Sequence, residues 1–301
     1  MIPIKFRNKN SVDILYNEMI SIELIKKSSP KTLRRFGKIV EWCEINLEET
    51  FETIVKADLK RLKVIKEKFD KVSKKLGSQN KDFEDFEDFK NFMTETLYKQ
   101  KFPRKKFVEE LQVTVCPYCN RNFVNSTYKR TICDLDHFYD KATYPIFAVS
   151  FYNLIPVCHS CNHVKASGKL SYSPHDPRKH TDDLLSFDFY IKGMDFLNDK
   201  RKLGIEINYN NDFENNVLNL KLNDVYQIHT DLVQEYIKKY MIFNPDYIED
   251  LYEQNRSLFE SREEIYRVVY GNYLEEKDYG KRPLSKLTKD IMEKLFFLLQ
   301  E

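Results

Sequence analysis

Residues 116–161 read CPYCNRNFVNSTYKRTICDLDHFYDKATYPIFAVSFYNLIPVCHSC, with one Cys-x-x-Cys pair at each end. The four sulfurs belong to Cys116, Cys119, Cys158 and Cys161. The chain has only six cysteines, too few for a disulfide scaffold, and two pairs of identical spacing are typical of a structural zinc site with four thiolate ligands. The sequence therefore predicts a four-cysteine Zn²⁺ site that holds the two ends of this segment together.

The two cysteine pairs are further apart than in a simple zinc ribbon. Between Cys119 and Cys158 lie 38 residues, whereas a ribbon has about 15 to 20. Another structural element is therefore inserted between the pairs. Three alternatives to four-sulfur coordination stay open at this point: redox-active Cys-x-x-Cys pairs, a coincidence of four unrelated cysteines, and the replacement of one sulfur by His159 or His163.

The inserted segment predicts two strands and a helix. Residues 131–137 (TICDLDH) alternate and predict a strand that ends in Asp136-His137, and residues 153–157 (NLIPV) predict a returning strand. The second cysteine pair then opens a predicted helix that carries Asn162. Two strands and a helix held by zinc form a compact scaffold for a second, metal-centred site.

The polar residues of this scaffold match the needs of phosphodiester hydrolysis, which are an activated water, a cation and a group that orients the base. His137 can deprotonate water, because an imidazole ordinarily titrates near neutral pH. Asp136 and Asn162 can offer oxygen ligands to Mg²⁺ or Mn²⁺. Asn153 can hold the loop that positions the ring of His137. Four cations are expected to contact phosphates of a nucleic acid: Lys165, Lys169, Arg121 and Lys141.

The chain resembles zinc-stapled HNH (ββα-metal) endonucleases in three ordered motifs: Asp136-His137, Asn153-Leu154 and Cys158-x-x-Cys161-Asn162-x-x-Lys165. This resemblance implies that His137 is the general base, that Asp136 and Asn162 bind the catalytic metal, and that Asn153 orients the base. Many members of the family have histidine in place of Asn162. Because His163 follows directly in this chain, it is the alternative ligand.

The wider context of these motifs, including Tyr144-Pro145 and residues 222–229, is similar to HNH nucleases of Septu-like and retron-linked bacterial anti-phage systems. This looser resemblance implies a DNA endonuclease of anti-phage defence that works beside an ATPase partner subunit. Two alternatives stay open. One is a non-catalytic zinc module that binds nucleic acid. The other is an RNase, because such a site acts on the phosphate and does not choose the sugar.

The charge distribution favours a polyanionic partner. Although the net charge of the 301 residues is only +2, residues 101–180 hold 12 Lys or Arg against six Asp or Glu, and the rest of the chain has 37 against 41. No apolar run approaches the roughly 18 residues of a membrane span, and residues 1–10 (MIPIKFRNKN) lack the basic, apolar and small-residue order of a signal peptide. A cytoplasmic protein without a membrane partner is therefore expected. Cys43 and Cys133 are expected to be buried structural thiols.

The fold class predicted around this centre is α+β, mostly helical, in three parts. These are a helical N-terminal region (1–105), the zinc-bound HNH nuclease domain (106–180), and a C-terminal β-meander followed by helices (181–301). The N-terminal part shows apolar residues at helical spacing up to Leu76, a break at 77–80, and a stripe expected to pack in a core or interface, namely Phe83, Phe86, Phe89 and Phe92.

The predicted β-meander consists of three alternating segments, 187–191, 203–209 and 217–222, separated by turn residues. Helical periodicity resumes near Asp224 and continues to the C-terminal segment 284–300.

Overall fold

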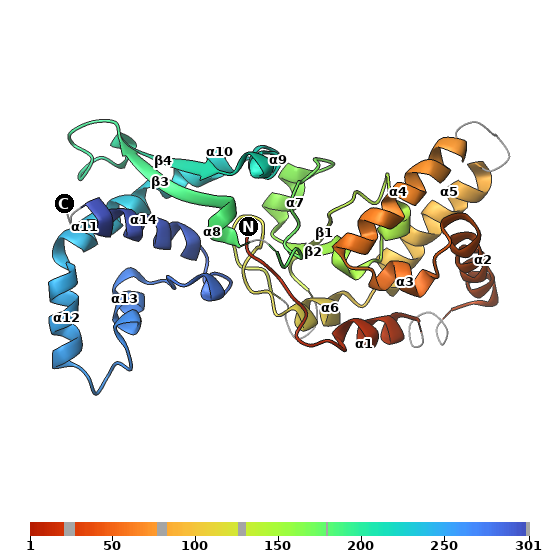
Figure 1. The fold of residues 1–301 in the computed structure, drawn as a ribbon, viewed down its shortest axis with the longest axis horizontal. Coiled ribbons are helices and arrows are strands. Elements are labelled where there is room, and N and C mark those ends of the chain that lie inside the picture. Colours follow the sequence, from red (N-terminus) through yellow and green to blue (C-terminus); the bar gives the residue numbers. More distant parts are fainter. Residues whose placement is uncertain (21–27, 77–82, 126–130, 179, 299–301) are drawn as a thin grey trace. The chain divides into compact units, whose positions relative to one another are not determined.

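The computed structural model describes residues 1–20, 28–76, 83–125, 131–178 and 180–298 (Figure 1). These residues form two compact units. The cysteine unit consists of Met1–Pro3, Thr114–Val124 and Cys158–Glu301, and the helical unit of Ile4–Val113 and Asn125–Val157. The predicted nuclease segment, 106–180, contributes to both units, and the predicted break at 77–80 lies outside the described residues.

The helical unit begins with the helices that the sequence predicted. In chain order they are α1 (Ser11–Asn17), α2 (Pro30–Leu47), α3 (Phe51–Lys56), α4 (Leu59–Leu76), α5 (Phe83–Asn91), a π-helical stretch (Phe92–Lys101) and α6 (Arg104–Leu111). The caps explain several boundaries. Ser29 and Thr50 accept hydrogen bonds from the backbone N–H groups of Thr32 (3.3 Å) and Thr53 (3.1 Å), which start α2 and α3.

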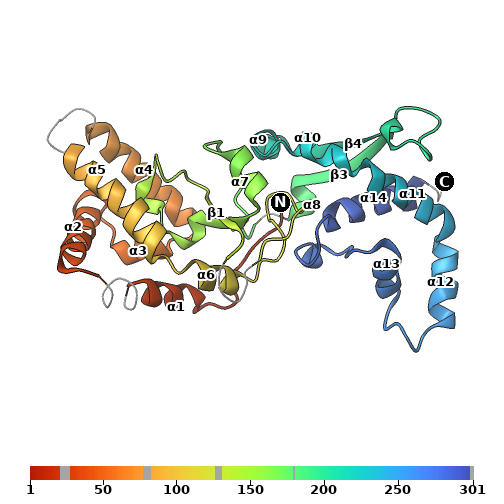
Figure 2. The ribbon, with the colours of Figure 1, turned by 180° about the vertical axis from the view of Figure 1, so that it is seen from behind.

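Aromatic side chains form part of the core of the helical unit, where α2 lies beside α4 and α5 (Figure 2). The ring of Trp42 lies 4.8 Å from that of Phe89, measured between centroids. Phe89 and Phe92 are buried, which confirms the packing role predicted for these two residues. The side chains of Phe83 and Phe86 lie outside the described part of the chain.

The helical unit also contains the two strands expected between the cysteine pairs. β1 (Asp134–His137) pairs antiparallel with β2 (Leu154–Val157), so that His137 lies opposite Leu154. Both predicted strands are confirmed, although each begins later than its predicted range, 131–137 for the first and 153–157 for the second. The connection between them is tied to α3, because the Ser150 hydroxyl donates a hydrogen bond to the carbonyl of Ile54 (3.0 Å).

The cysteine unit combines a two-stranded sheet with helices. β3 (Leu185–Ile191) and β4 (Leu203–Tyr209) form an antiparallel pair. The helices are α7 (His159–Lys165), α8 (Thr181–Leu184), α9 (Glu214–Asn219), α10 (Leu222–Tyr226), α11 (Thr230–Ile242), α12 (Pro245–Gln254), α13 (Arg262–Tyr270) and α14 (Ser285–Leu298). The α+β class and the mostly helical content are thus confirmed.

The prediction of a third strand in the β-meander is wrong, because residues 217–222 belong to α9, a short turn and α10. Val217 and Leu220 are buried, whereas Leu218 between them is 50% exposed. This three-residue spacing of buried side chains is helical, not extended. Lys221 then adopts a left-handed φ of 51°, which separates the two helices.

A buried ion-pair network anchors α14 to the sheet. The ammonium of Lys286, only 2% exposed, lies 2.7 Å from a carboxylate oxygen of both Asp182 and Asp290. Asp290 also accepts a hydrogen bond from the backbone N–H of Phe187 on β3 (2.8 Å). Because an unpaired buried charge is costly, these contacts fix the start of α14 against the rest of the unit.

Candidate functional site

The four cysteines of the two Cys-x-x-Cys pairs form one cluster in the cysteine unit, here called the cysteine cluster: Cys116, Cys119, Cys158 and Cys161. All four are buried, and their sulfurs lie within 4.8 Å of one another. The Cys119 and Cys158 sulfurs are 3.9 Å apart, close to the roughly 3.8 Å between two sulfurs on a tetrahedral zinc ion. The cluster can therefore hold a metal ion such as zinc.

The backbone around the first pair forms a tight knuckle. The N–H of Cys116 donates to the carbonyl of Asn122, and the N–H of Asn120 donates to the carbonyl of Cys116, both at 2.8 Å. Asn120 adopts a left-handed φ of 49°, which asparagine tolerates better than most residues. The knuckle also directs donors at the sulfurs, since the N–H of Arg121 lies 3.3 Å from Cys119 Sγ. Such donors orient metal ligands and stabilise thiolates.

The electrostatics of the cysteine cluster favour a bound cation. The nearby sulfurs of Cys116 and Cys119 raise the pKa of the Cys161 thiol well above its ordinary value. Four thiolates at this distance cannot coexist in a buried site without a compensating positive charge, whereas a zinc ion deprotonates coordinating thiols outright. Neither His159 nor His163 is part of the cluster in the described residues, and both are exposed.

The knuckle is anchored to the C-terminal part of the same unit. The Asn120 side chain donates to the carbonyl of Tyr279 (2.8 Å) and accepts from the N–H of Lys286 (3.1 Å). The hydroxyl of Tyr226, a buried residue, donates to the carbonyl of Cys119. The cysteine cluster is therefore built into the core that contains α10 and α14.

The end of β1 presents a carboxylate and an imidazole side by side in the chain. Asp136 and His137 are 4% and 5% exposed, respectively. Nε2 of His137 lies 3.0 Å from the carbonyl oxygen of Ala148. Because a carbonyl oxygen only accepts hydrogen bonds, Nε2 carries the proton of the neutral ring and Nδ1 is the basic nitrogen. This tautomer makes Nδ1 the atom that can take a proton from water.

Asn153 fixes the loop that follows His137. Its Oδ1 accepts from the N–H of Tyr139 (2.7 Å), and its Nδ2 donates to the carbonyls of Tyr139 and Phe147, both at 3.1 Å. The side chain is fully buried. Phe147 directly precedes Ala148, whose carbonyl contacts His137, so the bonds of Asn153 stabilise the segment that orients the imidazole.

Two residues beside His137 carried no sequence signal. The Tyr98 ring, on the π-helical stretch, packs edge-on against the imidazole with centroids 4.6 Å apart. Arg104 lies over the same tyrosine ring at 4.3 Å, and Lys141, a predicted phosphate contact, lies over it at 5.5 Å. No motif in the sequence includes Tyr98. Its position in a π-helix, a feature common at functional sites, becomes visible only in the structure.

The remaining predicted site residues lie in the cysteine unit. Asn162 is half-buried on α7, and its proposed role as a metal ligand stays a prediction, as does that of His163. Among the predicted phosphate contacts, Lys165 is buried and Lys169 is exposed. Arg121 donates from Nε to Nε2 of His229 (3.0 Å). An exposed lysine fits a phosphate contact better than a buried one, so Lys169 is the stronger candidate of the two.

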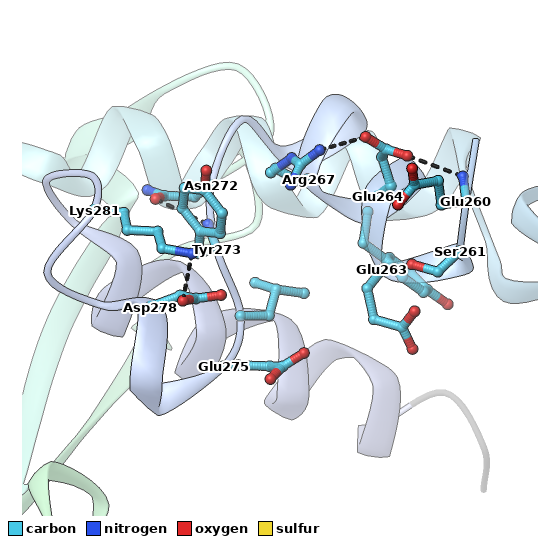
Figure 3. Close-up of a pocket in the computed structure, with 12 residues that line it drawn as sticks. Glu260, Ser261, Glu263, Glu264, Arg267, Asn272, Tyr273, Glu275, Asp278 and Lys281 are labelled. Carbon is cyan, nitrogen blue, oxygen red and sulfur yellow. Dashed lines mark hydrogen bonds and ion pairs between the residues drawn. The ribbon is translucent and has the colours of Figure 1, made fainter. Parts of the chain in front are cut away.

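A hollow of about 250 Å³ lies between α13 and the segment that precedes α14 (Figure 3). Five of the side chains around it are acidic, namely Glu260, Glu263, Glu264, Glu275 and Asp278. The two basic ones, Arg267 and Lys281, pair with Glu264 (2.5 Å) and Asp278 (2.7 Å). This excess of negative charge would repel phosphates, and the hollow includes none of the predicted site residues.

No known protein family, curated protein or solved structure matches the chain. In the described residues, no helix combines the length and the apolar composition that a bilayer span requires.

Proposed function

We propose that the chain is a metal-dependent endonuclease of the HNH type that hydrolyses phosphodiester bonds of DNA. The observation that carries this proposal is the end of β1, where an imidazole held through Nε2 by the Ala148 carbonyl follows a carboxylate in the chain. Asn153 braces the adjoining loop from inside. Phosphodiester hydrolysis of this kind requires a base that activates water, an oxygen ligand for the cation and a group that orients the base.

In the proposed mechanism, Nδ1 of His137 takes a proton from the attacking water. The carbonyl of Ala148, 3.0 Å from Nε2, keeps the ring in the required tautomer and stabilises the imidazolium that forms. Asp136 offers a carboxylate oxygen to a divalent cation, and one carboxylate suits Mg²⁺, which keeps several of its waters. When bound, the cation supplies charge neutralisation at the scissile phosphate and the leaving oxygen.

The cysteine cluster has a structural role in this proposal. A site with four sulfur ligands leaves no open position for water or substrate, unlike catalytic zinc sites with three protein ligands. The zinc ion would therefore hold the fold and take no part in hydrolysis. The resemblance of the sequence to HNH nucleases of Septu-like and retron-linked systems supports a further proposal, that the enzyme serves in anti-phage defence beside an ATPase partner. The excess of positive charge in residues 101–180 supports a nucleic-acid substrate.

A plasmid assay tests the proposed activity. The purified chain is incubated with supercoiled DNA and Mg²⁺ or Mn²⁺, and we expect nicked or linear product from the wild type but not from His137→Ala. His180→Ala is the matched control, because His180 is exposed and pairs with Glu276; it should cut like the wild type. Zinc content and circular dichroism check that the His137 variant is folded.

The same assay separates the two alternatives. Cleavage of RNA but not DNA, lost in His137→Ala, would make the enzyme an RNase with the same site. Identical behaviour of wild type and His137→Ala on both DNA and RNA would exclude the nuclease, and a zinc-stabilised nucleic-acid-binding module would take its place.

A further inference from the structure

We propose that Arg104 and Lys141, both held on the ring of Tyr98, form an anion subsite for a backbone phosphate of the nucleic acid next to His137. This inference rests on the proposed function and adds a substrate-binding element to it. The ligand is the phosphodiester group itself, so the subsite would bind without regard to base sequence.

The first support is the arrangement of the side chains. Tyr98 is buried, and its hydroxyl donates to the backbone carbonyl of Leu135 on β1 (3.0 Å), which fixes the ring against the strand. One part of this ring contacts the imidazole of His137, and the two cations lie 4.3 Å (Arg104) and 5.5 Å (Lys141) from its centre. Both cations are therefore only one aromatic ring away from the candidate general base.

The second support is the lack of direct ion pairs. Neighbouring lysines are paired: Lys99 with Glu95 at 2.6 Å and Lys105 with Glu109 at 3.5 Å. Arg104 and Lys141, by contrast, form no direct ion pair in the described part of the chain, and both are partly exposed. The charge of Lys141 does act on the neighbouring carboxylate of Asp140, whose pKa it helps to lower. Arg104 and Lys141 therefore keep N–H donors that no carboxylate engages in a direct ion pair, and a phosphate can accept from these donors.

The position of the Arg104 guanidinium over the Tyr98 ring suits this role. Arginine stacks on an aromatic ring through its face, while its N–H donors point outward in the plane of the group. Arg104 can therefore keep its contact with Tyr98 and still donate to phosphate oxygens. Lysine acts as a point charge with rotatable donors, so Lys141 can complete the subsite from a second side.

The test measures DNA binding by the full chain in buffer without Mg²⁺ or Mn²⁺, so that no cleavage interferes. Fluorescence anisotropy with two unrelated labelled duplexes gives the affinity over a range of salt concentrations. We expect Arg104→Gln and Lys141→Gln each to weaken binding about fivefold to tenfold near physiological salt, and to reduce the slope of log K against log salt by about 1 for both duplexes. Lys99→Gln, which removes a paired lysine, should leave the slope unchanged.

Further variants distinguish a binding role from a packing role. Arg104→Lys keeps the charge and should retain the wild-type slope, whereas a purely structural role would lower the free energy of unfolding without changing the slope. An unchanged slope in both glutamine variants, or absence of DNA and RNA binding by the wild type at low salt, would overturn the subsite.

The outcomes also separate this inference from the proposed function. If the variants lose the salt-dependent contact but the wild type never cuts nucleic acid, the subsite holds and the nuclease fails. If Arg104→Gln and Lys141→Gln cut plasmid DNA as well as the wild type with an unchanged slope, the nuclease holds and the subsite fails.

Discussion

Asn153 shows how one side chain can organise a candidate active site without taking part in the chemistry. Its amide accepts one hydrogen bond and donates two, and all three partners are backbone groups of the loop between β1 and β2. An aspartate would lose both donors, and an alanine all three bonds. Because the side chain is fully buried, water cannot easily replace what it provides.

We therefore expect Asn153→Ala to lower the free energy of unfolding by about 2 to 4 kcal/mol, since it leaves buried backbone groups unpaired. Urea denaturation measures this. Asn46→Ala is the control in the same unit, because Asn46 makes one bond to the carbonyl of Trp42, and it should cost about 1 kcal/mol. Equal losses in the two variants would contradict the bracing role of Asn153.

At the scale of elements, the sequence was informative where local pattern and tertiary contacts agree. The alternation in residues 131–137 correctly predicted β1, and the returning strand expected at 153–157 is β2. The equally regular alternation of 217–222 did not, because the same residues also fit a helical spacing and the packing of Val217 and Leu220 decides between them. The place of Tyr98 could not be predicted, since nothing local to it indicates a contact with His137.

The contact between α4 and the end of α2 gives a pH-dependent prediction. Glu49 is almost fully buried and accepts hydrogen bonds from Arg61 (2.6 and 2.7 Å) and Lys68 (3.1 Å). Burial alone would raise its pKa, but the bonds from Arg61 and Lys68 keep the pKa below the usual value. A carboxylate with a lowered pKa in the folded state stabilises at neutral pH, and this stabilisation is lost as pH falls below about 4.5.

Glu49→Gln should accordingly reduce the free energy of unfolding at pH 7 by about 1 to 3 kcal/mol, and the difference from the wild type should shrink as the pH falls below about 4.5. Urea titrations at several pH values measure both effects. The adjacent Glu48 is 85% exposed, so Glu48→Gln should change little at any pH. A pH-independent difference for Glu49→Gln would refute the ion-pair explanation.

At the scale of the whole molecule, the cysteine cluster was the best-predicted feature, because the spacing of its four cysteines is visible in the sequence. Its surroundings were not predictable. The bonds from Asn120 to Tyr279 and Lys286 join residues far apart in the chain and have no sequence pattern. The catalytic roles of Asp136, His137 and Asn162 stay predictions until activity is measured.

Removal of the metal should therefore affect more than the knuckle. We expect one zinc per chain by elemental analysis, and we expect Cys116→Ser or a strong chelator to release it and to unfold the cysteine unit. Hydrogen exchange should show lost protection in 114–124 and at the start of α14, which the Asn120 bonds connect. Cys43→Ala, which removes a buried cysteine outside the cluster, should retain zinc. A folded, zinc-free Cys116→Ser protein would disprove the structural metal site.

The partners of the knuckle determine when, during synthesis of the chain, its contacts can form. The chain leaves the cysteine unit after Val124, contributes β1 and β2 to the helical unit, and returns at Cys158. On the ribosome, the first two sulfurs emerge well before their partners, and the groups at 279 and 286 that bind Asn120 emerge later still. The early knuckle therefore keeps reduced thiols until the second cysteine pair and the groups at 279 and 286 have been synthesised.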